Sequence, residues 1–106
     1  MFSPFSLVIV IPCYNECLKL ELAKYSLFIS NNKDVFICFV NDGSKDNTLQ
    51  ILSELKEQFP LNVAIVSYKK NLGKGEAVRA GMIYCNKSIK YNHIAYLDAD
   101  LAVSLE

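Results

Sequence analysis

Four apolar runs along the chain alternate with segments in which apolar residues recur at helical spacing. The runs are LVIVI at 7–11, VFICFV at 35–40, VAIVS at 63–67 and IAYLD at 94–98. Continuous apolar runs rich in β-branched residues are typical of central strands whose two faces are both covered by helices. We therefore expect these four segments to form a mainly parallel sheet in which every strand is buried on both faces.

Between the runs, apolar residues fall three or four positions apart, as they do on one face of a helix. The three sets are Leu18, Leu22, Tyr25 and Ile29; Leu49, Leu52, Leu55 and Phe59; and Ala77, Ala80, Gly81 and Tyr84. The order βαβαβαβ predicts an α/β fold with an open, doubly wound sheet, because right-handed crossovers place helices on both faces. A length of 106 residues with 52% hydrophobic content indicates one domain spanning residues 1–106.

Polar clusters directly follow all four predicted strands. They are PCYNE at 12–16, NDGSKDN at 41–47, KKNLGKG at 69–75 and DADL at 98–101. The carboxyl ends of parallel strands meet at one edge of a sheet, and ligands of open α/β sheets bind outside that edge. The sequence therefore predicts one site assembled from four distant segments.

Two carboxylates follow the second strand, and we expect different roles for them. Asp46 stands just before a helical segment, where a short acceptor satisfies free N–H groups and a negative charge suits the helix dipole. Asp42 lies at the strand tip before Gly43, where the chain must turn and its backbone can approach a ligand closely. Asp-Gly turns are also common in structural loops, so this segment alone supports a functional and a structural role equally.

Asp98 and Asp100 are two positions apart and point the same way on extended chain. Two carboxylates side by side repel each other unless positive charge lies near them. Magnesium takes one or two carboxylates and completes its coordination shell with water and substrate phosphates. The D-x-D pattern is common by chance, but at a strand end it is a candidate site for Mg²⁺ or Mn²⁺.

The other two clusters are individually less specific. The segment after the third strand contains four cations, Lys69, Lys70, Lys74 and Arg79. Cations at a helix start suit phosphate, although the spacing is not that of a G-x-x-x-x-G-K-[ST] loop and a solvated basic loop is the alternative. PCYNE lacks the glycines of the dinucleotide-binding turn, and its Asn15 and Glu16 are equally suited to capping the first helix.

Composition limits the partners and the location. Eleven basic and eleven acidic side chains give no net charge, so no global field attracts nucleic acid or an anionic membrane. The four cysteines form no C-x-x-C pair and there is one histidine, so buried reduced thiols are expected rather than zinc. No leader pattern opens the chain and no apolar run approaches the ~18 residues of a bilayer span, which indicates a cytoplasmic protein.

The motifs VIVIPCYNE, FVNDGSKDNT, NLGKGEAVRAGM and YLDADLA resemble, in order and spacing, those of glycosyltransferase family 2 enzymes with the GT-A fold. They are most similar to those of the polyprenyl-phosphate and dolichyl-phosphate glucosyl and mannosyl transferases. The resemblance begins at Leu7 and covers nearly the whole chain. It implies the Rossmann-like nucleotide-binding half of an inverting, metal-dependent enzyme that transfers sugar from a nucleotide-diphosphate donor. Receiver-type domains and sugar nucleotidyltransferases share the βα alternation, but the acidic cluster or Gly-rich loop that they need after the first strand is absent.

The resemblance also implies a role for each cluster. The matched positions are Pro12, Tyr14 and Glu16 in the first nucleotide-contacting loop, Asp42 with Gly43 at the base-reading aspartate, Lys74 beside the nucleotide, and Asp98 and Asp100 in the metal-binding D-x-D motif. A carboxylate accepts hydrogen bonds, and uracil and guanine each offer a ring N–H that adenine and cytosine lack. A UDP-sugar is therefore the favoured ligand, with a GDP-sugar as the second candidate and Mg²⁺ or Mn²⁺ as the cofactor.

Family members continue past the D-x-D motif into a half that binds the acceptor and supplies the catalytic base, and often into membrane segments. Because this sequence stops at Glu106, we expect a chain cut after that motif, with no catalytic residue of its own and no transfer activity. A sheet edge left exposed in this way favours a homodimer. For the whole protein, the candidate acceptor is a polyprenyl phosphate and the candidate location is the cytoplasmic membrane face. The alternative is a non-catalytic nucleotide-sugar-binding module.

Overall fold

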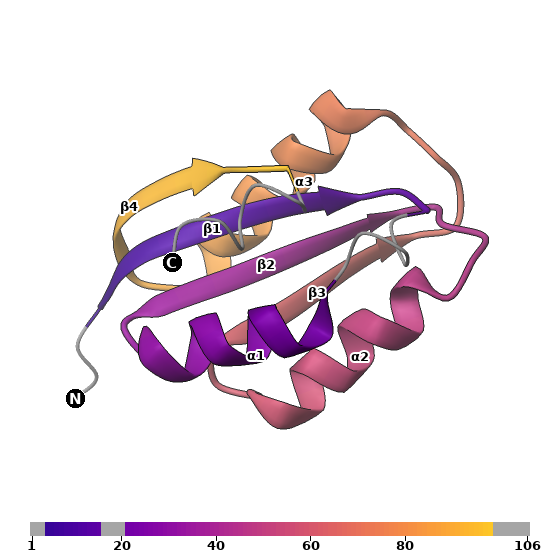
Figure 1. The fold of residues 1–106 in the computed structure, drawn as a ribbon. Coiled ribbons are helices and arrows are strands. Elements are labelled where there is room, and N and C mark those ends of the chain that lie inside the picture. The colour runs from indigo at the N-terminus through magenta and orange to yellow at the C-terminus, as the bar shows by residue number, and fades with distance from the viewer. Residues whose placement is uncertain (1–3, 16–20, 99–106) are drawn as a thin grey trace.

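The computed structural model describes residues 4–15 and 21–98. Its elements are β1 (Phe5–Cys13), α1 (Leu22–Asn31), β2 (Val35–Asp42), α2 (Thr48–Gln58), β3 (Val63–Tyr68), α3 (Lys74–Ser88) and β4 (Tyr91–Tyr96). The strands pair in parallel in the order β3-β2-β1-β4. The predicted βαβαβαβ order and the doubly wound parallel sheet are confirmed (Figure 1).

Helices cover both faces of the sheet: α1 and α2 lie on one face and α3 lies on the other (Figure 1). Along β1, Ile9 and Ile11 belong to the core under α1 and α2, whereas Val8 and Val10 belong to the core under α3. Successive side chains of a strand point to opposite faces, so a strand covered on both sides must be apolar at every position. This explains the uninterrupted apolar run of β1.

The predicted burial is wrong for both outer strands of the sheet, and the predicted bounds are wrong for one of them, β4. β4 spans Tyr91–Tyr96 rather than 94–98, and most of its side chains are exposed. β3 is buried at its start and loses burial toward Tyr68. These two are the outermost of the described strands, so each has one strand neighbour and partial helix cover. An outer strand of this kind tolerates polar residues, so the ends of an apolar run do not predict where the strand begins and ends.

The cysteines in the described part of the chain are buried, as expected. Cys13 lies in the core under α1 and α2, and Cys38 and Cys85 lie in the core under α3. A hydrogen bond with Cys85, together with burial, raises the pKa of the Cys38 thiol and keeps it protonated. Cys17 lies outside the described residues. No helix within residues 4–15 and 21–98 has the length and apolarity needed to cross a membrane.

α3 approaches the sheet closely at Gly81. A Cβ atom at this position would lie 2.5 Å from Cγ1 of Val10 and 2.9 Å from Cγ2 of Val40. Real Cβ atoms do not come so close to other carbons, so only glycine allows this separation of helix and sheet. The depth at which α3 lies, and with it the position of its first residue, Lys74, follows from this contact.

Replacing Gly81 with alanine should therefore destabilise the fold. Forcing an extra methyl group into a packed core costs ~1–3 kcal/mol, which outweighs the gain in helix propensity. Gly75→Ala is the matched control in the same helix, because a Cβ there meets nothing within 4 Å. Urea unfolding should show a lower free energy of unfolding for Gly81→Ala and an equal or higher one for Gly75→Ala. Equal stability of the two variants would show that the close approach is not maintained.

Candidate functional site

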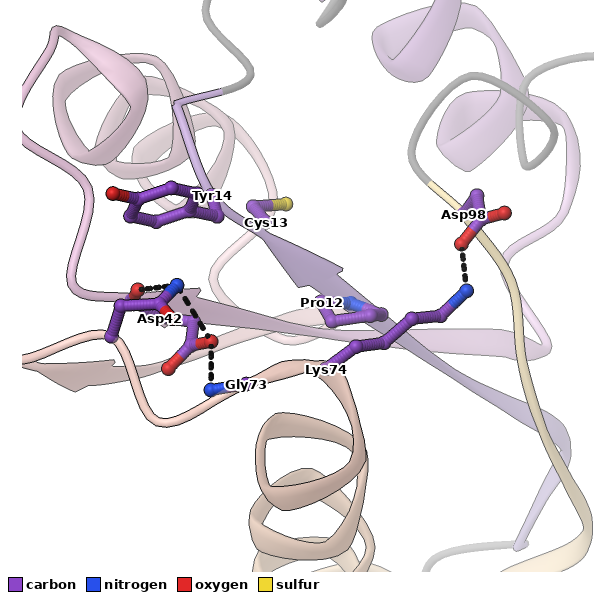
Figure 2. A pocket seen from close by; sticks show the side chains of 8 residues that line it. Pro12, Cys13, Tyr14, Asp42, Gly73, Lys74 and Asp98 are labelled. Carbon is purple, nitrogen blue, oxygen red and sulfur yellow. Dashed lines mark hydrogen bonds and ion pairs between the residues drawn. The ribbon is translucent and has the colours of Figure 1, made fainter.

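One hollow lies at the carboxyl ends of the strands, and it is lined by residues from all four predicted clusters. It has a volume of about 250 Å³ and is lined by Pro12, Cys13, Tyr14, Asp42, Asn71, Gly73, Lys74 and Asp98. Figure 2 shows these side chains around the tips of β1 and β2 and the start of α3. The convergence predicted from the strand ends is confirmed for the described residues.

The Asp42 carboxylate forms the buried side of this hollow. Asp42 is the last residue of β2 and is 2% exposed. Its Oδ1 accepts a hydrogen bond from the backbone N–H of Leu72 at 2.8 Å, and its Oδ2 accepts one from the N–H of Gly73 at 3.0 Å. The Asn71 side-chain amide donates to the same Oδ2 at 3.2 Å. Three donors from the loop between β3 and α3 therefore converge on one carboxylate.

Gly43 brings that loop close to the end of β2. Its φ of +74° lies in the left-handed region, and a Cβ atom there would stand 2.4 Å from the backbone N of Asn71 and from the carbonyl carbon of Lys70. Glycine is required on both counts. Gly43 is buried and does not line the hollow, so its proposed contact with a nucleotide stays a prediction, whereas its structural role is visible.

Lys74 and Asp98 form an ion pair at the opposite side of the hollow. The Lys74 Nζ lies 2.6 Å from Asp98 Oδ1, and both side chains are about half exposed (Figure 2). The hydrogen bond to Asp98, and then its charge, raise the pKa of Lys74, so the ammonium stays protonated at neutral pH. The ammonium also lies 6.0 Å from the centre of the Tyr96 ring. The pair joins the first residue of α3 to the segment after β4.

The loops after β1 and β2 are also joined to each other. The Asn15 N–H donates to Ser44 Oγ at 3.0 Å, and the Lys45 N–H donates to Asn15 Oδ1 at 2.9 Å. α1 begins only at Leu22. The interpretation of Asn15 as a cap of the first helix is therefore wrong, because its side chain holds the neighbouring loop. These bonds fix the chain beside Tyr14, whose ring is exposed and lines the hollow.

Asp46 has the role that its position predicts. Its Oδ1 accepts a hydrogen bond from the backbone N–H of Thr48 at 2.9 Å and another from the Thr48 hydroxyl. Thr48 is the first residue of α2, so the carboxylate satisfies a donor in the first turn. Asp42 and Asp46 are thereby separated: the first lines the hollow and the second stabilises a helix start.

Of the two residues predicted to bind a metal, the structure describes Asp98. Within residues 4–15 and 21–98, no three His, Cys, Asp or Glu side chains are placed to hold a metal ion together. Asp98 is a half-exposed oxygen donor, and one accessible carboxylate suits a divalent ion that takes its other ligands from water and phosphate. The Lys74 ammonium is then a competitor that the ion must displace. The other predicted metal ligand, Asp100, and the predicted loop residue Glu16 lie outside the described residues.

Sequence reasoning missed three residues that line the hollow, Cys13, Asn71 and Gly73. Asn71 lies in the cluster after the third strand and could have been found by the rule that led to Asp42. Its amide group donates both to the Asp42 carboxylate and to the Asp42 carbonyl oxygen, each at 3.2 Å. Of the four predicted cations in this segment, Lys74 lines the hollow and Lys69, Lys70 and Arg79 do not.

The family is shown by a comparison with family models. Residues 8–106 match the model of glycosyl transferase family 2. The chain belongs to this family, as the motifs predicted. It is also 38% identical over 103 residues to the dolichyl-phosphate β-glucosyltransferase of Saccharomyces cerevisiae, a match that covers 89% of this chain and 29% of that protein.

Two further relatives share a similar identity. Dolichyl-phosphate β-glucosyltransferase ALG5C of Trichomonas vaginalis is 32% identical over 116 residues, covering 100% of this chain and 33% of the relative. The uncharacterized protein MJ0544 of Methanocaldococcus jannaschii is 32% identical over 94 residues, covering 89% and 40%. The chain thus spans 40% or less of the length of these relatives.

Solved structures show the same fold at lower identity. The mannosyltransferase PcManGT from Pyrobaculum calidifontis, in complex with GDP-Man and Mn²⁺, superimposes with a TM-score of 0.70 at 18% identity, covering 92% of this chain and 28% of that chain. S. aureus TarS 1-349 in complex with UDP gives a TM-score of 0.70 at 20% identity, covering 90% and 27%. The described fold is therefore the GT-A fold of glycosyltransferases.

Proposed function

We propose that this chain is the nucleotide-sugar-binding domain of a family 2 glycosyltransferase, and that the whole protein transfers sugar from a nucleotide-diphosphate donor. The observation that carries the proposal is a single hollow with a buried carboxylate, Asp42, on one side and the Lys74–Asp98 ion pair on the other. A base and a diphosphate need chemically different partners of this kind. PcManGT was solved with GDP-Man, and TarS with UDP and with UDP-GlcNAc, which supports the choice of ligand class.

The nucleotide base is assigned to Asp42. A carboxylate has about four acceptor positions, and three donors of the β3–α3 loop occupy three of them. One position remains for the ring N–H of uracil or guanine, whereas adenine and cytosine have no such donor. Pro12 and Tyr14 line the hollow beside it and are proposed to contact the nucleotide, together with Glu16. UDP-sugar is the favoured donor and GDP-sugar the second candidate.

The diphosphate is assigned to the other side of the hollow. Lys74 offers an ammonium there at the amino end of α3, where the helix dipole also favours an anion. Asp98 and Asp100 are proposed to hold Mg²⁺ or Mn²⁺, which would stabilise the negative charge of the departing diphosphate. Among the described residues, the protein's own contribution is to hold the Lys74 ammonium and the Asp98 carboxylate on the side of the hollow facing away from Asp42.

The acceptor is proposed for the whole protein. Relatives named dolichyl-phosphate β-glucosyltransferases make a polyprenyl phosphate the candidate acceptor. Such an acceptor is anchored in a membrane by its lipid chain, so the cytoplasmic membrane face is the location that we propose. Transfer with inversion needs a base that removes the acceptor's proton, and we assign that role to none of the described residues. We propose that the 106-residue chain binds nucleotide but does not itself transfer sugar.

The nucleotide preference can be measured directly. We expect UDP to bind most tightly, GDP next, and ADP and CDP at least tenfold more weakly, because a lost hydrogen bond to a charged group costs about 1.5–3 kcal/mol. Isothermal titration calorimetry with the four diphosphates, in buffer containing Mg²⁺, gives the comparison. Equal affinity for all four would refute base recognition by Asp42, and absence of nucleotide binding would refute the proposed function.

The metal ligands can be tested by substitution. Asp98→Asn and Asp100→Asn should each abolish most of the increase in UDP affinity that Mn²⁺ produces. A metal site with only two protein ligands has no other side chain that could replace the lost carboxylate. Glu57→Gln, an exposed position on α2, is the control and should retain the full increase. UDP titrations with and without Mn²⁺, and electron paramagnetic resonance of the unbound Mn²⁺, measure the effect. An undiminished increase in both aspartate variants would place the metal elsewhere.

Self-association of the chain is a further consequence. β4 is outermost among the described strands, and its exposed Tyr96 ring adds apolar surface beside an unpaired strand edge. Such edges recruit other chains, so we expect a homodimer. Light scattering during size-exclusion chromatography should give twice the monomer mass. A monomer mass throughout the accessible concentration range would contradict this expectation.

A further inference from the structure

We propose that Asp42 is a positioning residue for the phosphate side of the hollow, and that it acts through the loop formed by residues 69–73. The inference rests on the proposed function, in which Asp42 contacts the base, but it assigns the carboxylate a second task. That task is to hold the amino end of α3, and therefore Lys74, in the place where a diphosphate is bound. Base recognition and phosphate binding would then depend on one side chain.

The contacts of the carboxylate point to this role. Its partners are the backbone N–H groups of Leu72 and Gly73 and the side chain of Asn71, at 2.8, 3.0 and 3.2 Å. Gly73 is the residue that precedes α3, and its carbonyl oxygen accepts the N–H of Ala77 in the first turn. Asp42 thus holds the residue from which the helix starts. Asp42 itself is 2% exposed, so these hydrogen bonds are shielded from water.

The neighbouring glycine shows that loop and strand end are closely packed as well as hydrogen-bonded. At Gly43, a side-chain carbon would overlap the backbone of Lys70 and Asn71 at 2.4 Å. The loop therefore has no room to move toward β2, and the three hydrogen bonds oppose movement away from it. Contact and hydrogen bonding together define one position of the loop.

Lys74 follows Gly73 directly, so its location depends on that position. Without the Asp42 carboxylate, two backbone N–H groups and an amide lose a charged acceptor, and the loop gains access to other conformations. Affinity for a ligand falls in proportion to the fraction of molecules in the competent conformation. Removing the carboxylate should consequently weaken the binding even of ligands that contain no base. If Asp42 only recognised the base, its removal would leave the binding of such ligands unchanged.

Inorganic pyrophosphate in the presence of Mg²⁺ is the probe, because it has phosphates and no base. We expect Asp42→Ala to weaken pyrophosphate binding about tenfold or more in calorimetry, in addition to its effect on UDP. Glu57→Ala removes a carboxylate from the exposed face of α2 and should leave pyrophosphate affinity unchanged. Wild-type pyrophosphate affinity in Asp42→Ala, with UDP binding lost, would overturn the inference and leave the proposed function intact.

A second variant tests the same loop with the carboxylate kept. Gly43→Ala should displace residues 70 and 71 and lower the affinity for pyrophosphate as well, although Asp42 remains. Amide hydrogen exchange measured by NMR needs no ligand: the N–H groups of Leu72 and Gly73 should exchange at least about tenfold faster in Asp42→Ala than in wild type. Unchanged exchange would overturn the inference, as would a wild-type chain that binds UDP but not pyrophosphate.

Discussion

The candidate site depends on the hydrogen bonds that tie the end of β2 to the start of α3. A buried carboxylate is costly unless donors surround it, and a helix start has backbone N–H groups that need acceptors. Asp42 and the Leu72–Gly73 backbone satisfy both needs at once. The partners are about 30 residues apart in the chain, so the contact forms only when β2 and β3 are in register.

α3 is therefore located at two places along its length. Gly81 sets its distance from the sheet, because no side-chain atom fits between the helix and Val10 or Val40. The loop held by Asp42 sets where the helix begins. A helix fixed at its start and near its middle has little freedom to slide or tilt. The Lys74 ammonium can then meet the Asp98 carboxylate across the hollow without a further contact to guide it.

The sequence predicted the elements well where both faces of a strand are covered, and less well elsewhere. β1 and β2 carry the uninterrupted apolar runs that buried parallel strands need. β4 is mostly exposed and includes polar residues, so its apolar run begins three residues after the strand does. The rule for strand ends correctly brought Tyr14, Asp42, Lys74 and Asp98 to one hollow. The partners of Asp42 could not be predicted, because backbone N–H groups look alike at every position in a sequence.

The two charged sides of the hollow differ in how firmly they are held. The Asp42 carboxylate is buried with three donors, so it acts as part of the framework. The Lys74–Asp98 pair is half exposed, and water screens exposed ion pairs, so separating it costs little. In the proposed function, a diphosphate takes the ammonium and a divalent ion takes the carboxylate. Each ligand removes the partner that would otherwise compete with the other, which makes their binding mutually favourable.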